Sequence, residues 1–107
     1  MTNFTLEDLE TIVAARAGST DGSSYTATLA RKGAAHTAKK LGEEAVETII
    51  AGTSEGDEAL RQEAADLLYH LLVLLECRGV AIGDVLQVLE GRAGLSGLQE
   101  KADRAKR

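Results

Sequence analysis

The chain has 107 residues, enough for one domain with a single core and not for two. Its net charge of −5 at pH 7 disfavours nucleic acid as a partner, because phosphate backbones are bound by clustered Lys and Arg. A lone cysteine excludes an intramolecular disulfide, and neither a signal peptide nor an apolar run long enough for a bilayer is present, which predicts a cytoplasmic protein.

The first half of the chain predicts helices, since proline is absent and aliphatic residues and alanine dominate the apolar set. Thr5 and Asp8 form a capping box that begins a helix, and this helix ends near Gly18. A polar loop rich in Ser and Gly follows. Residues 25–32 then form a short helical segment, which Gly33 breaks or bends.

The second half predicts two longer helices, over residues 34–51 and 57–79, with Asp57 as the N-cap of the second. A shorter helix covers residues 82–89, with an acidic residue in its first turn, where the helix dipole favours a negative charge. Residues 92–107 are charged and begin with a glycine-interrupted stretch, so we expect a mobile C-terminal tail there.

The helix over residues 57–79 also bears on assembly. Within residues 64–75 only three positions are not Ala, Leu or Val, namely Asp66, Tyr69 and His70. A helix that is apolar almost all round is buried on nearly all sides. The other helices of one chain are too few and too short to cover it. We therefore expect an all-α bundle of four to five helices over residues 1–91, completed by homodimerisation.

Three carboxylates share one face of the helix over residues 34–51. At about 100° per residue, Glu47 lies within about 60° of both Glu43 and Glu44. Lys40 falls between Glu43 and Glu44 on the same face. A solvated acidic surface would explain this pattern by itself, because each like-charge pair on a helix costs only a few tenths of a kcal/mol.

The next helix favours a cation site over a solvated acidic surface. Glu63 and Asp66 are i,i+3 neighbours on its only polar stripe, with His70 one turn further on. Carboxylates crowded at about 5 Å repel by roughly 3 kcal/mol per pair at an effective dielectric near 20. A cation must offset this repulsion. Oxygen ligands favour a hard ion, Mg²⁺, or Mn²⁺ as a substitute. His70 either orients a ligating carboxylate or is a core residue bonded to the backbone.

Other metal sites fit the sequence less well. One cysteine and two histidines cannot close a structural zinc site. A di-iron bundle would need two Glu-x-x-His pairs, and none is present. A non-catalytic dimerising bundle with an incidental acidic face remains a further alternative.

Magnesium held by carboxylates with open water positions typically meets a polyphosphate, which predicts nucleotide or pyrophosphate chemistry. Lys40 lies beside the acidic face and Lys32 lies upstream of it, so both are candidates to hold phosphate oxygens. Each is alternatively a solvated helix charge. Tyr25 either packs with its hydroxyl tethered or stacks on a base.

The order of these segments resembles that of the all-α nucleotide pyrophosphatases, the MazG-like superfamily. Glu-Glu-x-x-Glu at residues 43–47, followed by Glu-x-x-Asp at residues 63–66, is similar to the signature of that superfamily. Four segments look like those of the phosphoribosyl-ATP pyrophosphatases of histidine biosynthesis: Ser24-Tyr-Thr-Ala-Thr-Leu29, Lys32-Gly33, residues 40–47 and residues 63–72. The match runs from about residue 5 to residue 91.

This resemblance implies Mg²⁺-dependent hydrolysis of phosphoribosyl-ATP to phosphoribosyl-AMP and pyrophosphate, on a helical fold that dimerises. The implied metal ligands are Glu44, Glu47, Glu63 and Asp66. The implied catalytic residues are Glu43, Glu44 and Glu47, with Glu43 a further ligand or a water-orienting group. The implied substrate-binding residues are Tyr25, Lys32 and Lys40.

Two points of function stay open at this stage. A general (d)NTP pyrophosphatase of the same superfamily would share the carboxylates without needing the segments upstream of them. Many relatives of the phosphoribosyl-ATP pyrophosphatases carry a fused cyclohydrolase domain for the next step, and this chain is too short for one. Any channelling would therefore need a separate cyclohydrolase partner.

Overall fold

The computed structural model describes residues 2–94 and 97–106 and shows an all-α fold, with no strand among the described residues. The helices in this part of the chain are α1 (Leu6–Ala17), α2 (Tyr25–Lys32), α3 (Ala34–Ser54), α4 (Asp57–Arg78), α5 (Ile82–Arg92) and α6 (Gly97–Ala105). None of them is long and apolar enough to cross a membrane. The all-α prediction is confirmed.

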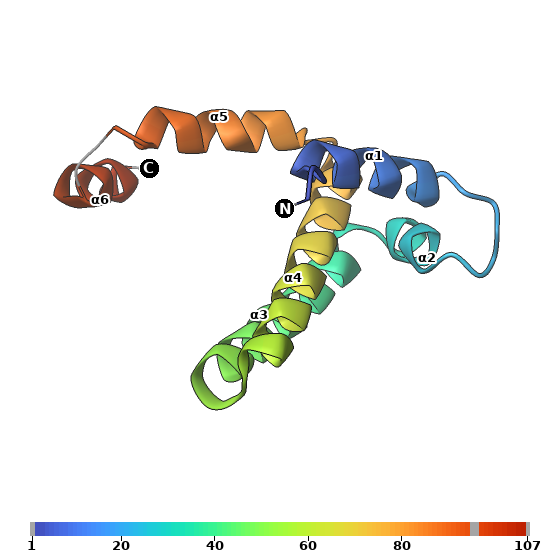
Figure 1. Ribbon diagram of the computed structural model, residues 1–107. Coiled ribbons are helices and arrows are strands. Elements are labelled where there is room, and N and C mark those ends of the chain that lie inside the picture. The colour runs from blue at the N-terminus through green and yellow to red at the C-terminus, as the bar shows by residue number, and fades with distance from the viewer. Residues whose placement is uncertain (1, 95–96, 107) are drawn as a thin grey trace.

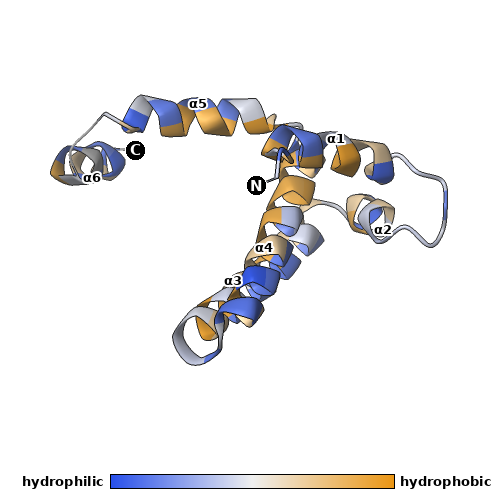
Figure 2. Ribbon diagram, in the orientation of Figure 1, coloured by the Kyte–Doolittle hydropathy of each residue, from blue (hydrophilic) through white to orange (hydrophobic). Residues whose placement is uncertain are grey.

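Helices α3 and α4 form a long antiparallel hairpin, and α1 and α2 pack at the end of it where α4 finishes (Figure 1). The core lies at this junction, where α1, α2, α4 and α5 meet through Val13, Leu29, Leu72, Val73 and Ile82. Figure 2 shows the apolar residues of α4 gathered in the same half of the helix, beside α1. The polar half of the hairpin is thereby left outside the core.

The helix boundaries follow from local chemistry. Thr5 Oγ1 accepts a hydrogen bond from the Asp8 amide, and the Asp8 carboxylate accepts one from the Thr5 amide, both at 3.0 Å. Gly33 has φ 93° and separates α2 from α3, while Gly79 ends α4 with φ 67°. Both positive φ values favour glycine, because a Cβ is strained there. The capping box and the break at Gly33 are thus confirmed.

Three boundaries differ from the expectation. Asp57 is the first helical residue of α4 and not its N-cap, because Gly56 occupies that position without a side-chain hydrogen bond. α3 continues to Ser54, and α5 continues to Arg92. Glycines inside a helix lower its propensity but do not end it when neighbouring turns are well formed.

Part of the expected C-terminal tail is helical, because α6 spans Gly97–Ala105. Residues 95, 96 and 107 of that tail lie outside the described residues. α5 begins in the core and then extends away from the hairpin, and α6 follows it (Figure 1). The start of α5 is tied to α1 by a hydrogen bond of 2.7 Å, in which the Ile82 amide donates to Glu10 Oε2.

A single chain leaves part of α4 uncovered. His70, Leu72 and Val73 are buried, but Ala65 is exposed and Leu68 is 41% exposed. The core covers only the half of α4 that faces α1 and α2, in line with the expectation that the helices of one chain are too few and too short to cover this helix.

Candidate metal centre

Three carboxylates meet between α3 and α4. One oxygen from each of Glu44, Glu63 and Asp66 lies within 4.8 Å of the others. The Thr48 hydroxyl holds the two helices together beside them, with its Oγ1 2.7 Å from the Glu44 carbonyl oxygen and 3.1 Å from the Glu63 carbonyl oxygen. The antiparallel hairpin thus brings together residues that are about twenty positions apart in sequence.

The Glu47 carboxylate interacts with this cluster and raises two pKa values in it. A hydrogen bond with the Glu47 carboxyl, which requires a shared proton, is the largest cause that raises the pKa of Glu63 to about 7. Partial burial and repulsion from Glu47, Glu44 and Asp66 act in the same direction. The pKa of Glu44 is raised by burial first and then by Glu47 and Asp66. The four predicted metal ligands therefore repel one another.

Two oxygens of the cluster have no hydrogen-bond donor. Glu44 Oε2 and Glu63 Oε2 are both buried, and no donor among the described residues reaches either of them. An acceptor left without a partner in this way is costly. A cation placed among the carboxylates would satisfy both oxygens and offset the repulsion. The donor set fits Mg²⁺ or Mn²⁺, which prefer oxygen ligands.

His70 does not add a nitrogen ligand to this set. Its Nδ1 lies 2.7 Å from the backbone carbonyl oxygen of Asp66, and its Nε2 lies 3.0 Å from the Tyr25 hydroxyl. Both ring nitrogens are therefore engaged. Of the two hypotheses for His70, the structure supports the buried histidine bonded to the backbone, because neither nitrogen bonds a carboxylate.

Glu43 lies outside the cluster. Its Oε2 pairs with Lys40 Nζ at 3.5 Å, and the Lys40 and Glu43 side chains are 38% and 48% exposed. Lys32 is exposed at the end of α2 and makes no hydrogen bond or ion pair within the described part of the chain. The structure of the single chain therefore brings together four of the predicted acidic residues and leaves Glu43, Lys40 and Lys32 on the surface.

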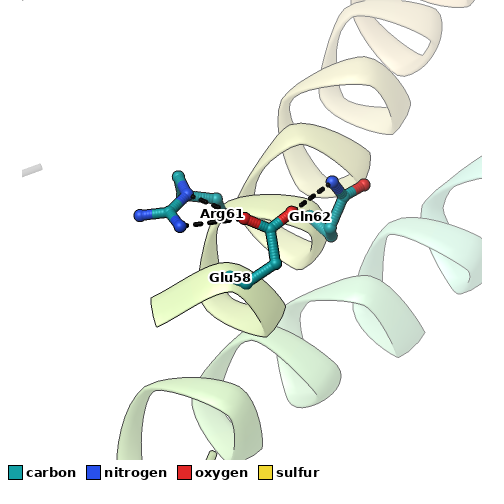
Figure 3. A network of polar contacts seen from close by, with 3 residues as sticks. All are labelled: Glu58, Arg61 and Gln62. Atoms are coloured by element: carbon teal, nitrogen blue, oxygen red, sulfur yellow. Dashed lines mark hydrogen bonds and ion pairs between the residues drawn. The ribbon is translucent and has the colours of Figure 1, made fainter. Parts of the chain in front are cut away.

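A second acidic site on α4 shows what an ordinary surface carboxylate looks like (Figure 3). Glu58 accepts hydrogen bonds from Arg61 Nη2 at 2.8 Å and from Gln62 Nε2 at 3.0 Å. These bonds, from Gln62 first and then from Arg61, lower the pKa of Glu58. Glu58 has partners one turn away and needs no cation.

Two residues that the sequence did not single out, Thr48 and Arg16, lie beside the carboxylates and in a separate cavity respectively. Thr48 lies four residues after Glu44, so helical spacing was the available signal for it. Arg16 lines a cavity of about 320 Å³ at the start of α2, together with Ser19, Asp21, Ser24, Tyr25 and Thr26. No sequence pattern marked Arg16, because the loop that brings α2 back beside α1 decides its place.

Comparison with known proteins identifies the family of the chain. The family model described as phosphoribosyl-ATP pyrophosphohydrolase matches residues 6–93. A phosphoribosyl-ATP pyrophosphatase of Rhizobium meliloti (strain 1021) is 54% identical over 104 residues, which cover 97% of each chain.

Two further relatives carry the same description. The phosphoribosyl-ATP pyrophosphatase of Nitrobacter winogradskyi is 53% identical over 97% of this chain and 90% of its own. That of Agrobacterium fabrum (strain C58) is 51% identical over 97% of both chains. With its motifs, its all-α fold and these matches, the chain belongs to the phosphoribosyl-ATP pyrophosphohydrolase family.

Proposed function

We propose that this protein hydrolyses phosphoribosyl-ATP to phosphoribosyl-AMP and pyrophosphate, as a step of histidine biosynthesis in the cytoplasm. The observation that carries the proposal is the group of converging carboxylates between α3 and α4, with two buried oxygens that have no donor. Family membership supports the choice of substrate.

Glu44, Glu47, Glu63 and Asp66 would hold Mg²⁺, for which Mn²⁺ can substitute. When bound, the ion supplies positive charge for phosphate oxygens and lowers the pKa of a water that attacks phosphorus. The two helices keep the carboxylates at fixed separation, and Thr48 fixes the backbone of Glu44 and Glu63. The proposed ligands would therefore be in place before the substrate arrives.

The remaining predicted residues keep their proposed roles. Glu43 would orient the attacking water or add a further ligand. Lys40 would leave its weak 3.5 Å pair with Glu43 to meet a phosphate oxygen, because an exposed pair of this kind holds its partners loosely. Lys32 would contribute to substrate binding from the end of α2, and Tyr25 from its start.

The deciding assay measures pyrophosphate release from phosphoribosyl-ATP with Mg²⁺ and with EDTA. We expect release only with the metal, and a higher kcat/KM than on any NTP or dNTP. An equal rate on dNTPs would point to a general nucleotide pyrophosphatase. No release from any nucleotide would leave a non-catalytic bundle.

We also propose that the protein is a homodimer. Val46, Ile49 and Ile50 on α3 are 47–63% exposed, and Val88 and Leu89 on α5 are at least half exposed. An apolar hollow of about 380 Å³ lies where the chain start meets α4, lined by Phe4, Thr5, Leu6, Leu9, Ala65, Leu68 and Tyr69. Exposed apolar surface of this extent is typical of an interface.

Light scattering at micromolar concentration tests the dimer, and a monomer would contradict it. Ile49→Glu should lower the dimer fraction, whereas Thr53→Glu, one turn further on α3, serves as the control for charge. A separate cyclohydrolase chain is the partner we propose for the following step. Co-elution of the two proteins in gel filtration would support that partnership.

A further inference from the structure

His70 connects two parts of the molecule that the proposed function uses separately. It lies on α4, is only 6% exposed, and bonds through both ring nitrogens. One bond goes to the backbone of Asp66, one turn back on the same helix, and the other goes to Tyr25 at the start of α2. The same imidazole therefore contacts the turn that carries a metal ligand and a substrate-binding candidate.

The partners fix which nitrogen carries the proton. The Asp66 carbonyl oxygen can only accept, so Nδ1 must donate to it across 2.7 Å. In the neutral ring Nε2 then has a free lone pair and accepts a hydrogen bond from the Tyr25 hydroxyl, with 3.0 Å between the two atoms. The rings also pack edge to face, with centroids 5.8 Å apart. Tyr25 is thus held both by a hydrogen bond and by ring contact.

Tyr25 is held in a position suited to a ligand. It is 50% exposed and lines the 320 Å³ cavity at the start of α2, beside the Arg16 side chain. Its hydroxyl proton is committed to His70, so the aromatic ring is what remains available. Aromatic faces bind nucleotide bases by stacking.

We propose that His70 is a positioning residue for the nucleotide. It keeps the Tyr25 ring at a fixed place relative to Asp66, so that the base resting on Tyr25 stays in register with the phosphoanhydride at the carboxylates. A ring held in its bound rotamer loses less entropy on binding, which strengthens binding without altering the chemical step. This inference rests on the proposed function and goes beyond it.

Two single substitutions each remove the hydrogen bond between Tyr25 and His70, one by changing the donor and the other by changing the acceptor. Tyr25→Phe removes only the hydroxyl of an exposed ring, so the fold is preserved. His70→Asn retains a donor for the Asp66 carbonyl but is too short to reach Tyr25. His70→Gln is long enough to offer Tyr25 an acceptor again. Tyr69→Phe is the matched control, since Tyr69 also packs edge-on against His70, at 5.4 Å between centroids.

We expect Tyr25→Phe and His70→Asn each to raise KM for phosphoribosyl-ATP by about five- to tenfold, with kcat within about twofold of wild type. The double variant should be no worse than either single variant, because both remove one shared interaction. His70→Gln should recover part of the loss, and Tyr69→Phe should leave KM unchanged.

The proposal is overturned if the two losses multiply in the double variant, or if His70→Asn lowers kcat at unchanged KM. Thermal unfolding of every variant separates these effects from loss of folded protein. If the wild-type chain does not cleave phosphoribosyl-ATP, the proposed function fails by itself. The same variants are then compared by calorimetry on the Kd for Mg-ATP, with the same expected ratios.

A readout without activity comes from ¹⁵N NMR of the histidine rings, which is simple because the chain has only His36 and His70. We expect a protonated Nδ1 and an unprotonated Nε2 for His70 in the wild type. Tyr25→Phe should shift the Nε2 resonance and leave Nδ1 and His36 in place. A protonated Nε2, or no response to Tyr25→Phe, would overturn the inference.

Discussion

Two glutamates five residues apart on α4, Glu58 and Glu63, have opposite electrostatic surroundings. Glu58 accepts hydrogen bonds from Arg61 and Gln62, which lower its pKa (Figure 3). Glu63 has a buried oxygen without a donor and a pKa raised to about 7. On the same helix, the Glu58 carboxylate therefore has hydrogen-bond donors, whereas the Glu63 carboxylate has a buried oxygen without one.

The difference comes from which helix supplies the neighbours. The partners of Glu58 lie three and four residues ahead on α4, so any helix with this sequence would provide them. The neighbours of Glu63 include Glu44 and Glu47 from α3, so only the hairpin creates its surroundings. A carboxylate that has a raised pKa and no hydrogen-bond donor, held between two packed helices, indicates a functional site better than an acidic sequence pattern alone.

The largest expected effect is on catalysis. Glu63→Gln and Asp66→Asn should each lower kcat/KM for phosphoribosyl-ATP by at least about 100-fold, because each removes a charged ligand of the proposed metal. Glu58→Gln, the matched control on the same helix, should stay within about twofold of wild type. Pyrophosphate release gives the comparison. Equal losses of kcat/KM for Glu63→Gln and Glu58→Gln would show that the two glutamates do not differ in function.

Metal binding should separate the two glutamates next. Mg²⁺ at about 100 times its Kd stabilises a protein with one site by about 2.7 kcal/mol, so the melting temperature should rise by several degrees. Glu58→Gln should show the same rise, and Glu63→Gln should show little or none. Differential scanning calorimetry with and without EDTA makes the measurement. A rise of wild-type size in Glu63→Gln would place the ion elsewhere.

The hairpin contact that creates the difference can be weakened directly. Thr48→Val removes the hydroxyl shared by the Glu44 and Glu63 carbonyl oxygens and should cost about 1 kcal/mol of unfolding free energy. Thr53→Val is the control, because Thr53 is exposed and bonds only within its own helix turn. Urea denaturation reports both. Equal costs would mean that Thr48 does not link the helices.

The smallest effect is the pH dependence of the metal-free protein. The pKa of Glu63 is raised from 4.5 to about 7, so the folded state binds its proton more tightly than the unfolded state. Its stabilising contribution is complete below about pH 4.5 and is lost as pH rises through about 7. Glu58 has a lowered pKa, so its contribution is present above about pH 4.5 and is lost at lower pH.

Unfolding midpoints in urea with EDTA, measured between pH 4 and pH 8, test these opposite slopes. Glu63→Gln should reduce the decline of stability toward pH 8, and Glu58→Gln should reduce the loss at the acid end. A variant Glu63→Gln that declines as steeply as wild type would show that Glu44 alone sets the slope.

Much of the fold was predictable because it depends on near neighbours in sequence. The capping box at Thr5, the break at Gly33 and the end of α4 at Gly79 each use residues within one turn. The extent of α5 was missed because Gly91 lies inside the helix without ending it, and α6 was missed because its sequence was assigned to a tail. The incomplete cover of α4 within one chain was expected from its apolar composition, but composition does not tell which half of α4 the other helices reach.

The site was predictable only in part, for a related reason. Helical spacing could group Glu44 with Glu47, and Glu63 with Asp66, but it also grouped Glu43 and Lys40 with the first pair. In the structure Glu43 turns to Lys40 and stays outside the cluster. The family resemblance narrowed the substrate beyond what the spacing of acids allows, and the comparisons agree with it.

The sequence by itself determined the helices, their caps and the residue types available for a cation, because these follow from interactions within a turn or two of the chain. The tertiary structure decided which of those residues meet. The α3–α4 hairpin sets Glu44 and Glu47 against Glu63 and Asp66, and the return of α2 brings Tyr25 to His70. Contacts between residues about twenty to forty-five positions apart depend on packing, and no local pattern specifies them.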